Sequence, residues 1–256
     1  MITRVYARVR HGEHILFGEL FGDVFEVINP GHGVDAPNPG STLPAAGLQY
    51  LAPVTPSKIV AIALNYRAHA AEMKKPIPEE PMFFLKPSTA IIAAGSPIVL
   101  PPESADVHHE AELGLVLAKP LHRASVEEAK KSLLGVTCVN DVTARDIQRR
   151  QNHYTRAKGY DTFCPIGPFV VGGVDPLDLR VRLRVNGEVR QDGRTSDMIF
   201  GPWELLSFVS HIMTLLPGDV VSTGTPPGVG PMRAGDIVEV DIDNVGLLRN
   251  PVVAAT

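Results

Sequence analysis

Hydrophobic and polar residues alternate along several short stretches of the chain, which is the pattern of half-buried β-strands. Three such stretches fall within residues 4–28, separated by HGEH and by Gly22-Asp23. LRVRLRV and EVRQ flank Asn186-Gly187, a pair that favours the type I′ turn of a β-hairpin. Further strands are expected at SKIVAIAL, MFFLKP, PIVLPP, ADVHHEAELGLVLAK, GVTCVND, GDVVSTG and DIVEVDID.

Helical periodicity is confined to a few segments. A short helix is expected over residues 66–74, with Asn65 as its cap and the proline-rich KPIPEEP as its stop. Ser125 followed by Glu128 forms a capping box for a helix over residues 125–135. Two more helices are expected over residues 143–151 and, beginning at Pro202, over 202–216. Strands and helices do not alternate regularly, so the pattern predicts a mainly β protein with few helices, antiparallel or mixed in its sheets.

A change in composition predicts a domain boundary. Residues 29–47, NPGHGVDAPNPGSTLPAAG, are rich in proline and glycine and show hardly any periodicity, which is typical of a linker or a covering loop. We place the boundary near residue 52. This predicts a small N-terminal β domain with its linker at residues 1–52 and a larger domain at residues 53–256.

Composition narrows the possible partners. The 24 Lys and Arg residues against 28 Asp and Glu give a net charge of -4, without the basic stripe that nucleic acids or anionic membranes attract. No uninterrupted apolar run reaches the length of about 18 residues that a membrane helix needs, and the N-terminus lacks a signal core. The two cysteines have no CxxC spacing. We therefore expect a cytoplasmic protein whose partner is a small molecule, with no nucleic-acid or membrane partner.

The first candidate site is acidic. Glu110 and Glu112 lie two apart on an expected strand, so they point to one side together with His108. Asp141 follows another strand, where side chains project into clefts. Three carboxylates suit Mg²⁺ or Mn²⁺ better than zinc, although His108 or His109 could serve the latter. The alternatives are glutamates on a solvent-facing edge strand and a helix-capping role for Asp141.

Such a site needs further positive charge to accept an anionic substrate. One divalent ion held by three carboxylates leaves a residual charge of -1. Lys86, Arg145 and Lys158 are the candidates for supplying the missing positive charge, and each could equally be a solvated surface residue.

The second candidate site is an acid-base pair. His69 and Glu72 lie three apart on the expected helix, within hydrogen-bonding reach. A carboxylate that holds an imidazole raises its basicity and fixes its tautomer, which suits a general base. The alternative is an ordinary surface pair. The following segment, residues 74–81, has the composition of a mobile flap that could bring the pair to a substrate.

Four segments in a fixed order identify a family. HHEAELGLVL, VNDVTARDIQ, KGYDTFCPIGPFVV and GDVVSTGTPPGVG together closely resemble the fumarylacetoacetate hydrolase family, and the match runs from SKIVAIALNY to LLRNPV. The resemblance implies a mixed β-sandwich roll, a homodimer, and Mg²⁺ or Mn²⁺ held by Glu110, Glu112 and Asp141. It further implies that Lys158 binds substrate and stabilises negative charge, that Arg145, Gln148 and Thr225 line the pocket, and that His69 and Glu72 are the acid-base dyad on a lid.

The resemblance also implies a class of reaction. A 2-oxo acid chelates the metal, and isomerisation, decarboxylation or hydrolysis then proceeds through an enolate. The overall pattern is most similar to the branch with 2-hydroxyhepta-2,4-diene-1,7-dioate isomerase and 5-oxopent-3-ene-1,2,5-tricarboxylate decarboxylase activity in aromatic compound catabolism. The alternatives are an acylpyruvate hydrolase of the fumarylpyruvate type, an oxaloacetate decarboxylase, and a non-catalytic β domain with a structural cation. His108 and His109 stand where many relatives carry Asp-Tyr.

Overall fold

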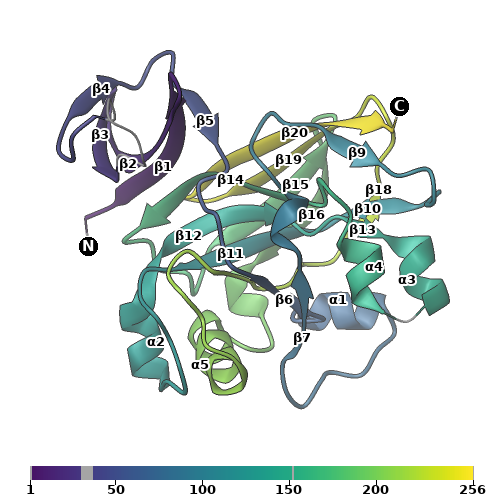
Figure 1. Ribbon diagram of the computed structural model, residues 1–256. Helices are drawn as coiled ribbons and strands as arrows, with labels where there is room; N and C mark the ends of the chain where they lie inside the picture. Colours follow the sequence, from purple (N-terminus) through teal and green to yellow (C-terminus); the bar gives the residue numbers. More distant parts are fainter. Residues whose placement is uncertain (1, 30–36, 152, 256) are drawn as a thin grey trace.

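One long sheet organises the molecule (Figure 1). The computed structural model describes residues 2–29, 37–151 and 153–255. The strands of this sheet are β1 (Arg4–His11), β2 (His14–Phe21), β3 (Val24–Asn29), β4 (Thr42–Pro44), β5 (Gln49–Leu51), β6 (Ile59–Ala63), β7 (Met82–Lys86), β8 (Ile91–Ile92), β11 (Ala111–Leu117), β12 (Leu133–Asn140), β14 (Cys164–Gly172) and β17 (Val220–Ser222). Their order is β4-β3-β2-β1-β14-β12-β11-β17-β6-β7, with β5 paired to β1 and β8 paired to β14. Most of the pairs are antiparallel, and β17 runs parallel to β6.

Two smaller sheets complete the β structure. The strands β16 (Glu188–Arg194), β15 (Arg180–Val185), β19 (Ile237–Ile242), β20 (Gly246–Ala254) and β9 (Ile98–Leu100) form one of them, in that order. The other consists of β13 (Thr143–Ala144), β10 (Val107–His109) and β18 (Gly230–Pro231). The main core lies between the long and the five-stranded sheet, where Leu113 and Leu115 of β11 pack with Val240 and Leu248. The expected fold class, a mainly β sandwich-like roll with few helices, is confirmed.

The helices are short and lie at the edges of the sheets (Figure 1). They are α1 (Arg67–Glu72), α2 (Val126–Ser132), α3 (Arg145–Gln151), α4 (Tyr154–Lys158) and α5 (Pro202–Ile212), together with the 3₁₀ turns η1 (Ser88–Ala90) and η2 (Thr195–Asp197). The capping box of α2 is present, with both the Ser125 and the Glu128 hydrogen bonds formed. The apolar stripe of α5 packs into the main core through Leu205, Leu206 and Val209. Among the described residues, no helix has the length and apolar character needed to cross a bilayer.

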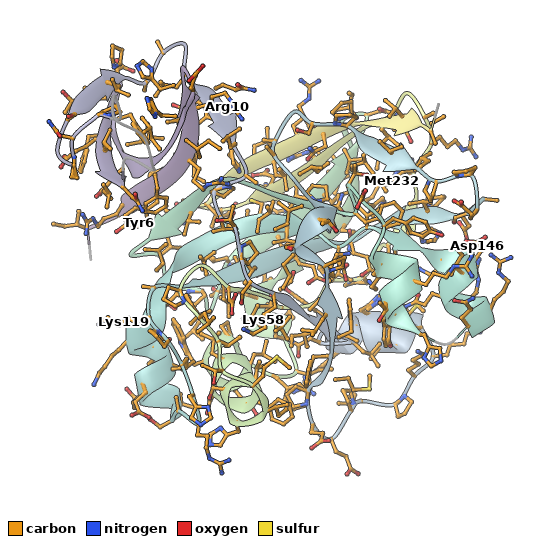
Figure 2. The ribbon with its side chains drawn as sticks, in the orientation of Figure 1. Tyr6, Arg10, Lys58, Lys119, Asp146 and Met232 are labelled. Atoms are coloured by element: carbon orange, nitrogen blue, oxygen red, sulfur yellow. The ribbon has the colours of Figure 1, made fainter. Side chains whose placement is uncertain are left out.

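The N-terminal strands form a small lobe that continues the long sheet (Figure 1). The odd-numbered residues Ala7 and Val9 of β1 face a core inside this lobe. Tyr6 points the other way, pairs in register with Val170 of β14 and packs at the boundary between the lobe and the body (Figure 2). The domain boundary near residue 52 stays a prediction.

Several details differ from the sequence expectations. The expected linker contains β4, which pairs with β3 because Leu43 covers the lobe core; residues 30–36 of that segment lie outside the described residues. The stretch 105–119 is two strands, since the chain leaves the three-stranded sheet at Glu110 and enters the long sheet at Ala111. The helix α4 was not expected, because its five residues carry no capping signal. The hairpin turn at Asn186-Gly187 is confirmed, both residues having positive φ.

Asn65 does not cap α1, as the sequence had suggested. Its side chain is fully buried and instead joins three separate segments. The Nδ2 group donates to the carbonyl oxygens of Phe200 (3.0 Å) and Thr223 (2.8 Å), and Oδ1 accepts from the Phe200 amide (2.9 Å). These bonds fix the start of the loop that leads into α1 against the end of β17.

Replacing Asn65 by Ala is expected to destabilise the protein by about 3 kcal/mol, because buried backbone groups would lose their partners. Chemical denaturation would measure this loss. The exposed Asn38, whose side chain makes no hydrogen bond among the described residues, provides the control variant Asn38→Ala. Equal free energies of unfolding for the two variants would contradict this role of Asn65.

Candidate active site

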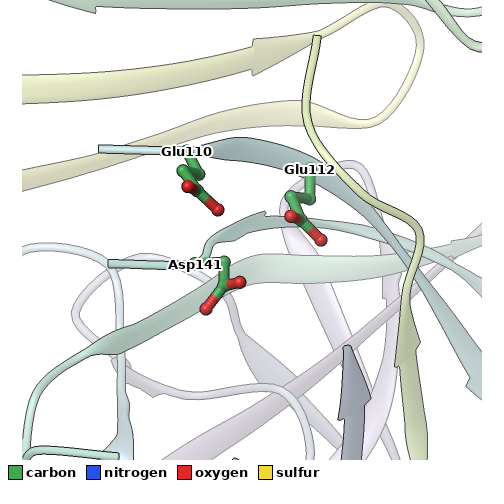
Figure 3. A group of neighbouring side chains, drawn as sticks. All are labelled: Glu110, Glu112 and Asp141. Carbon is green, nitrogen blue, oxygen red and sulfur yellow. The ribbon is translucent and has the colours of Figure 1, made fainter. Parts of the chain in front are cut away.

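Three carboxylates converge where β11 begins and the antiparallel β12 ends (Figure 3). Glu112 lies on β11, Glu110 precedes this strand and Asp141 directly follows β12. The antiparallel register brings Asp141 beside Glu110, and the Asp141 amide donates to the Glu110 carbonyl at 2.9 Å. One oxygen from each carboxylate lies within 4.8 Å of the other two. All three residues are buried, so the solvent-facing edge strand alternative is wrong. The carboxylate oxygens of Asp141 are bonded to Lys86 and Lys158 rather than to a helix amide, so the helix-cap alternative is wrong as well.

Three cationic side chains neutralise this cluster. Lys158 Nζ lies 2.7 Å from Glu110 Oε2 and 2.6 Å from Asp141 Oδ2. Lys86 Nζ, which is almost fully buried, lies 2.5 Å from Asp141 Oδ1. Arg145 forms an ion pair with Glu110 Oε1. All three were candidate positive charges in the sequence analysis, and the structure brings them together around the acidic cluster.

The charged neighbours act unequally on the two glutamates. Burial disfavours ionisation of Glu110, but the adjacent Lys158 and Arg145 outweigh this and hold its pKa well below the usual range. Glu112 has no cation in contact: burial, together with the charges of Asp141 and Glu110, raises its pKa to about 8. Burial alone would lower the pKa of Lys158, yet the carboxylates of Asp141 and Glu110 raise it. Glu112 is therefore the carboxylate that would gain most from an added cation.

The donor set fits a divalent ion. The three carboxylates carry a charge of -3 when ionised, and Lys86, Lys158 and Arg145 carry +3, so the cluster is neutral without a metal. One divalent ion would bring the total to +2. Clustered carboxylate oxygens are the ligands of Mg²⁺ and Mn²⁺, and an excess of positive charge suits an anionic substrate.

The histidine-glutamate pair is formed as expected. His69 Nδ1 lies 2.9 Å from Glu72 Oε2, and His69 is buried. A carboxylate can only accept a hydrogen bond, so Nδ1 carries the proton of this bond, and in the neutral imidazole Nε2 has a free lone pair. The other oxygen of Glu72 accepts from the Gly228 amide at 3.0 Å. Glu72 thus joins α1 to the loop that follows Thr225.

One pocket contains nearly all of the expected site residues. Its wall includes His69, Glu110, Glu112, Asp141, Arg145, Gln148, Lys158 and Thr225, whereas Glu72 lies behind His69. Arg145 donates to Gln148 Oε1 at 2.6 Å, which fixes two of these side chains relative to each other. His108 and His109 are not in this wall, because they bond to Asp106 and to Gln191.

Several other residues of the site had no sequence signal. Glu112 Oε2 accepts from Ser222 Oγ at 2.6 Å and from the Gly224 amide at 2.9 Å. Gly224 has a φ of 91°, and a Cβ there would lie 2.7 Å from Asn65, so only glycine fits this approach. Gln191, fully buried, accepts from the Ala111 amide and donates to Thr225 Oγ1 at 2.7 Å. These contacts depend on strand order, which local patterns do not reveal.

Comparisons with known proteins give matches over most of the chain. A family model described as fumarylacetoacetate (FAA) hydrolase C-terminal matches residues 58–253. Human mitochondrial oxaloacetate tautomerase is 41% identical over 224 residues, which cover 82% of this chain and 71% of that protein.

Two solved structures extend the comparison. The crystal structure of 2-hydroxyhepta-2,4-diene-1,7-dioate isomerase from Mycobacterium marinum is 39% identical, with a TM-score of 0.88 and coverage of 98% of each chain. Maleylpyruvate hydrolase from Sphingobium sp. SYK-6, in complex with manganese(II) and pyruvate, is 30% identical, with a TM-score of 0.80 and coverage of 98% of this chain and 100% of that one.

The raised pKa of Glu112 makes the stability of the metal-free protein depend on pH. Between the ordinary carboxyl pKa and about 8, the folded protein holds a proton on Glu112 that the unfolded chain has lost. The free energy of unfolding therefore falls as pH rises through this window, by at most about 1.4 kcal/mol per pH unit. Glu112→Gln is expected to remove this part of the slope in thermal unfolding between pH 5.5 and 7.5.

The exposed Glu103 provides the matched control, and Glu103→Gln is expected to keep the wild-type slope. Added Mg²⁺ or Mn²⁺ is expected to stabilise the wild-type protein, most strongly near pH 8, where Glu112 ionises. An unchanged slope in Glu112→Gln would show that other groups cause the pH dependence.

Proposed function

Because the chain belongs to the fumarylacetoacetate hydrolase family and is therefore an enzyme of that family, we propose that it is a divalent-metal-dependent isomerase of 2-oxo dicarboxylates. The proposed substrate is 2-hydroxyhepta-2,4-diene-1,7-dioate, for which the 39% identical M. marinum protein is named. Decarboxylation of 5-oxopent-3-ene-1,2,5-tricarboxylate is proposed as the partner activity, in aromatic compound catabolism.

The observation that carries this proposal is that His69 shares one pocket with the acidic cluster and with Arg145 and Lys158. An isomerase that moves a double bond next to a 2-oxo acid must bind an anion and transfer a proton at carbon. The surrounding Lys158 and Arg145 supply the positive charge, and His69 supplies a base. A domain that needed its cation only for stability would have no use for this base, which argues against that alternative.

Glu110, Glu112 and Asp141 would hold Mg²⁺ or Mn²⁺. When bound, the ion supplies a Lewis acid that polarises the 2-oxo group. Lys158, with its raised pKa, stays protonated and stabilises the negative charge that develops on the substrate. Arg145 and Gln148, which are bonded to each other, orient the anionic end of the substrate.

His69 is proposed as the residue that moves the proton. Glu72 holds the imidazole through Nδ1, so Nε2 takes the proton of the substrate's 2-hydroxyl group and delivers it to C5, which converts the 2-hydroxy-2,4-diene into the 2-oxo-3-ene. The burial of His69 keeps bulk water from competing in this transfer.

Two other reactions have support from relatives. Tautomerisation of oxaloacetate is the same proton transfer on a shorter dicarboxylate, and the 41% identical human relative is named for it. Hydrolysis of an acylpyruvate is the second alternative, for which the maleylpyruvate hydrolase neighbour provides the precedent. Decarboxylation of oxaloacetate, the homodimer and the cytoplasmic location stay predictions.

A small substrate panel would separate these reactions. Purified protein, with Mg²⁺ or with a chelator, is given 2-hydroxyhepta-2,4-dienedioate, oxaloacetate, acetylpyruvate and fumarylpyruvate. We expect ultraviolet decay of the dienol that depends on the ion and releases no pyruvate. Pyruvate release from an acylpyruvate would make the protein a hydrolase instead, and stability that depends on the ion without any turnover would favour the structural cation.

His69→Gln is expected to lower kcat on the substrate that is turned over by about a hundredfold or more, because it removes the base while a similar shape remains. Steady-state kinetics would measure this loss. His11, exposed at the end of β1, provides the control His11→Gln, which is expected to keep full activity. Full activity in His69→Gln would exclude His69 as the base.

A further inference from the structure

One positive charge on the pocket wall is not paired with a carboxylate. Arg145 and Lys158 are paired with Glu110, and His69 is bonded to Glu72. Lys75 also lines the pocket. In the described ranges, its ammonium group makes no ion pair and no hydrogen bond, and the residue is exposed.

The backbone of Lys75 is fixed to the helix that carries His69. The Lys74 amide donates to the Ala71 carbonyl and the Lys75 amide to the Ala70 carbonyl, each at 3.0 Å. Lys74 has a φ of 52°, so α1 ends in a Schellman motif with a lysine where glycine is usual. This turn directs the two adjacent lysines differently, because Lys75 lines the pocket and Lys74 does not.

The pocket wall combines the acidic cluster and Lys75 with uncharged side chains. Apolar and aromatic side chains form part of it, among them Ile62, Met73 and Phe84. Tyr154 stacks on Phe84 with 4.8 Å between ring centroids, so aromatic surface contributes to the apolar part of the wall. A molecule with an anionic head, an unsaturated carbon chain and a second negative charge would match this combination of charged and apolar surfaces.

We propose that Lys75 binds the distal carboxylate of the substrate and makes the pocket select 2-oxo dicarboxylates over 2-oxo monocarboxylates. The inference rests on the proposed function, which assigns the 2-oxo acid end of the substrate to the acidic cluster and its metal ion. The pocket's inner cations already contact protein carboxylates, whereas the ammonium of Lys75 is free to pair with a ligand. Its exposure at the pocket suits a contact that forms on substrate entry and breaks on product release.

The test compares two ligands that differ only in the distal group. 2-Oxoheptanedioate and 2-oxoheptanoate share the seven-carbon chain and the 2-oxo acid end, and only the first has a second carboxylate. Isothermal titration calorimetry on the Mg²⁺-loaded protein measures both dissociation constants. We expect the wild-type protein to prefer the dicarboxylate by about fivefold, the size of one partly solvated ion pair, and to lose this preference at high salt.

Matched variants identify the residue. Lys75→Met is expected to abolish the preference by weakening only the binding of the dicarboxylate, and Lys75→Arg is expected to retain it. Lys74→Met removes the same charge one residue away and is expected to keep the wild-type preference. The proposal would be overturned if Lys75→Met and Lys74→Met reduced the preference for the dicarboxylate equally, or if Lys75→Met weakened the binding of both ligands.

The outcomes also separate this inference from the proposed function. If both acids bind in the presence of Mg²⁺ and Lys75→Met keeps the preference, only the role of Lys75 fails. If neither acid binds to the wild-type protein, the 2-oxo acid site itself fails, and the inference is overturned with it.

Discussion

The arrangement of this site depends on one electrostatic requirement, the compensation of three buried carboxylates. Carboxylates removed from water at such short separations repel one another and cannot all ionise unless positive charge lies beside them. Lys158, Lys86 and Arg145 meet this need from three different elements. Glu112, which none of these cations contacts, shows what happens otherwise: its pKa rises to about 8. The site is therefore balanced such that one added divalent ion makes it strongly attractive to anions.

The sheets explain how this balance is built. The change from the three-stranded to the long sheet at Glu110 leaves this residue outside the regular ladder, where Asn140 Oδ1 rather than a strand neighbour accepts from its amide at 2.9 Å. Residues two apart then point to one face, so Glu112 joins Glu110 on the side away from the five-stranded sheet. The opposite, apolar face of β11 anchors the strand through Leu113 and Leu115. Rigid strands thus hold the carboxylates, while the short helices supply Arg145, Lys158 and His69.

Local patterns in the sequence predicted the parts of this structure that depend on neighbouring residues. The spacing of Glu110 and Glu112, the pair His69 and Glu72, the capping box at Ser125 and the turn at Asn186 all follow from periodicity or turn chemistry. Family resemblance added Gln148 and Thr225 and gave the candidate charge Lys158 its role. Ser222 and Gln191 could not be found in either way, because their partners lie far away in the chain and only strand order brings them together. Asn65 shows the opposite error. Its side chain is chemically suited to cap a helix, and the local pattern predicted that role, but in the structure it forms hydrogen bonds to distant segments instead.

The position of β17 in the sheet has a consequence for the order in which the molecule assembles during synthesis. This strand lies between β11 and β6, and it is made long after both. On the ribosome, Glu110, Glu112 and Asp141 emerge before Lys158, and before the Ser222 hydroxyl that accompanies Glu112. The growing chain therefore cannot complete the burial of its acidic residues early, because Lys158 and Ser222 do not yet exist, although Lys86 has already been made. Contacts between residues so far apart in the sequence form slowly and late in folding. The acidic cluster is therefore among the last parts of the molecule from which water is excluded.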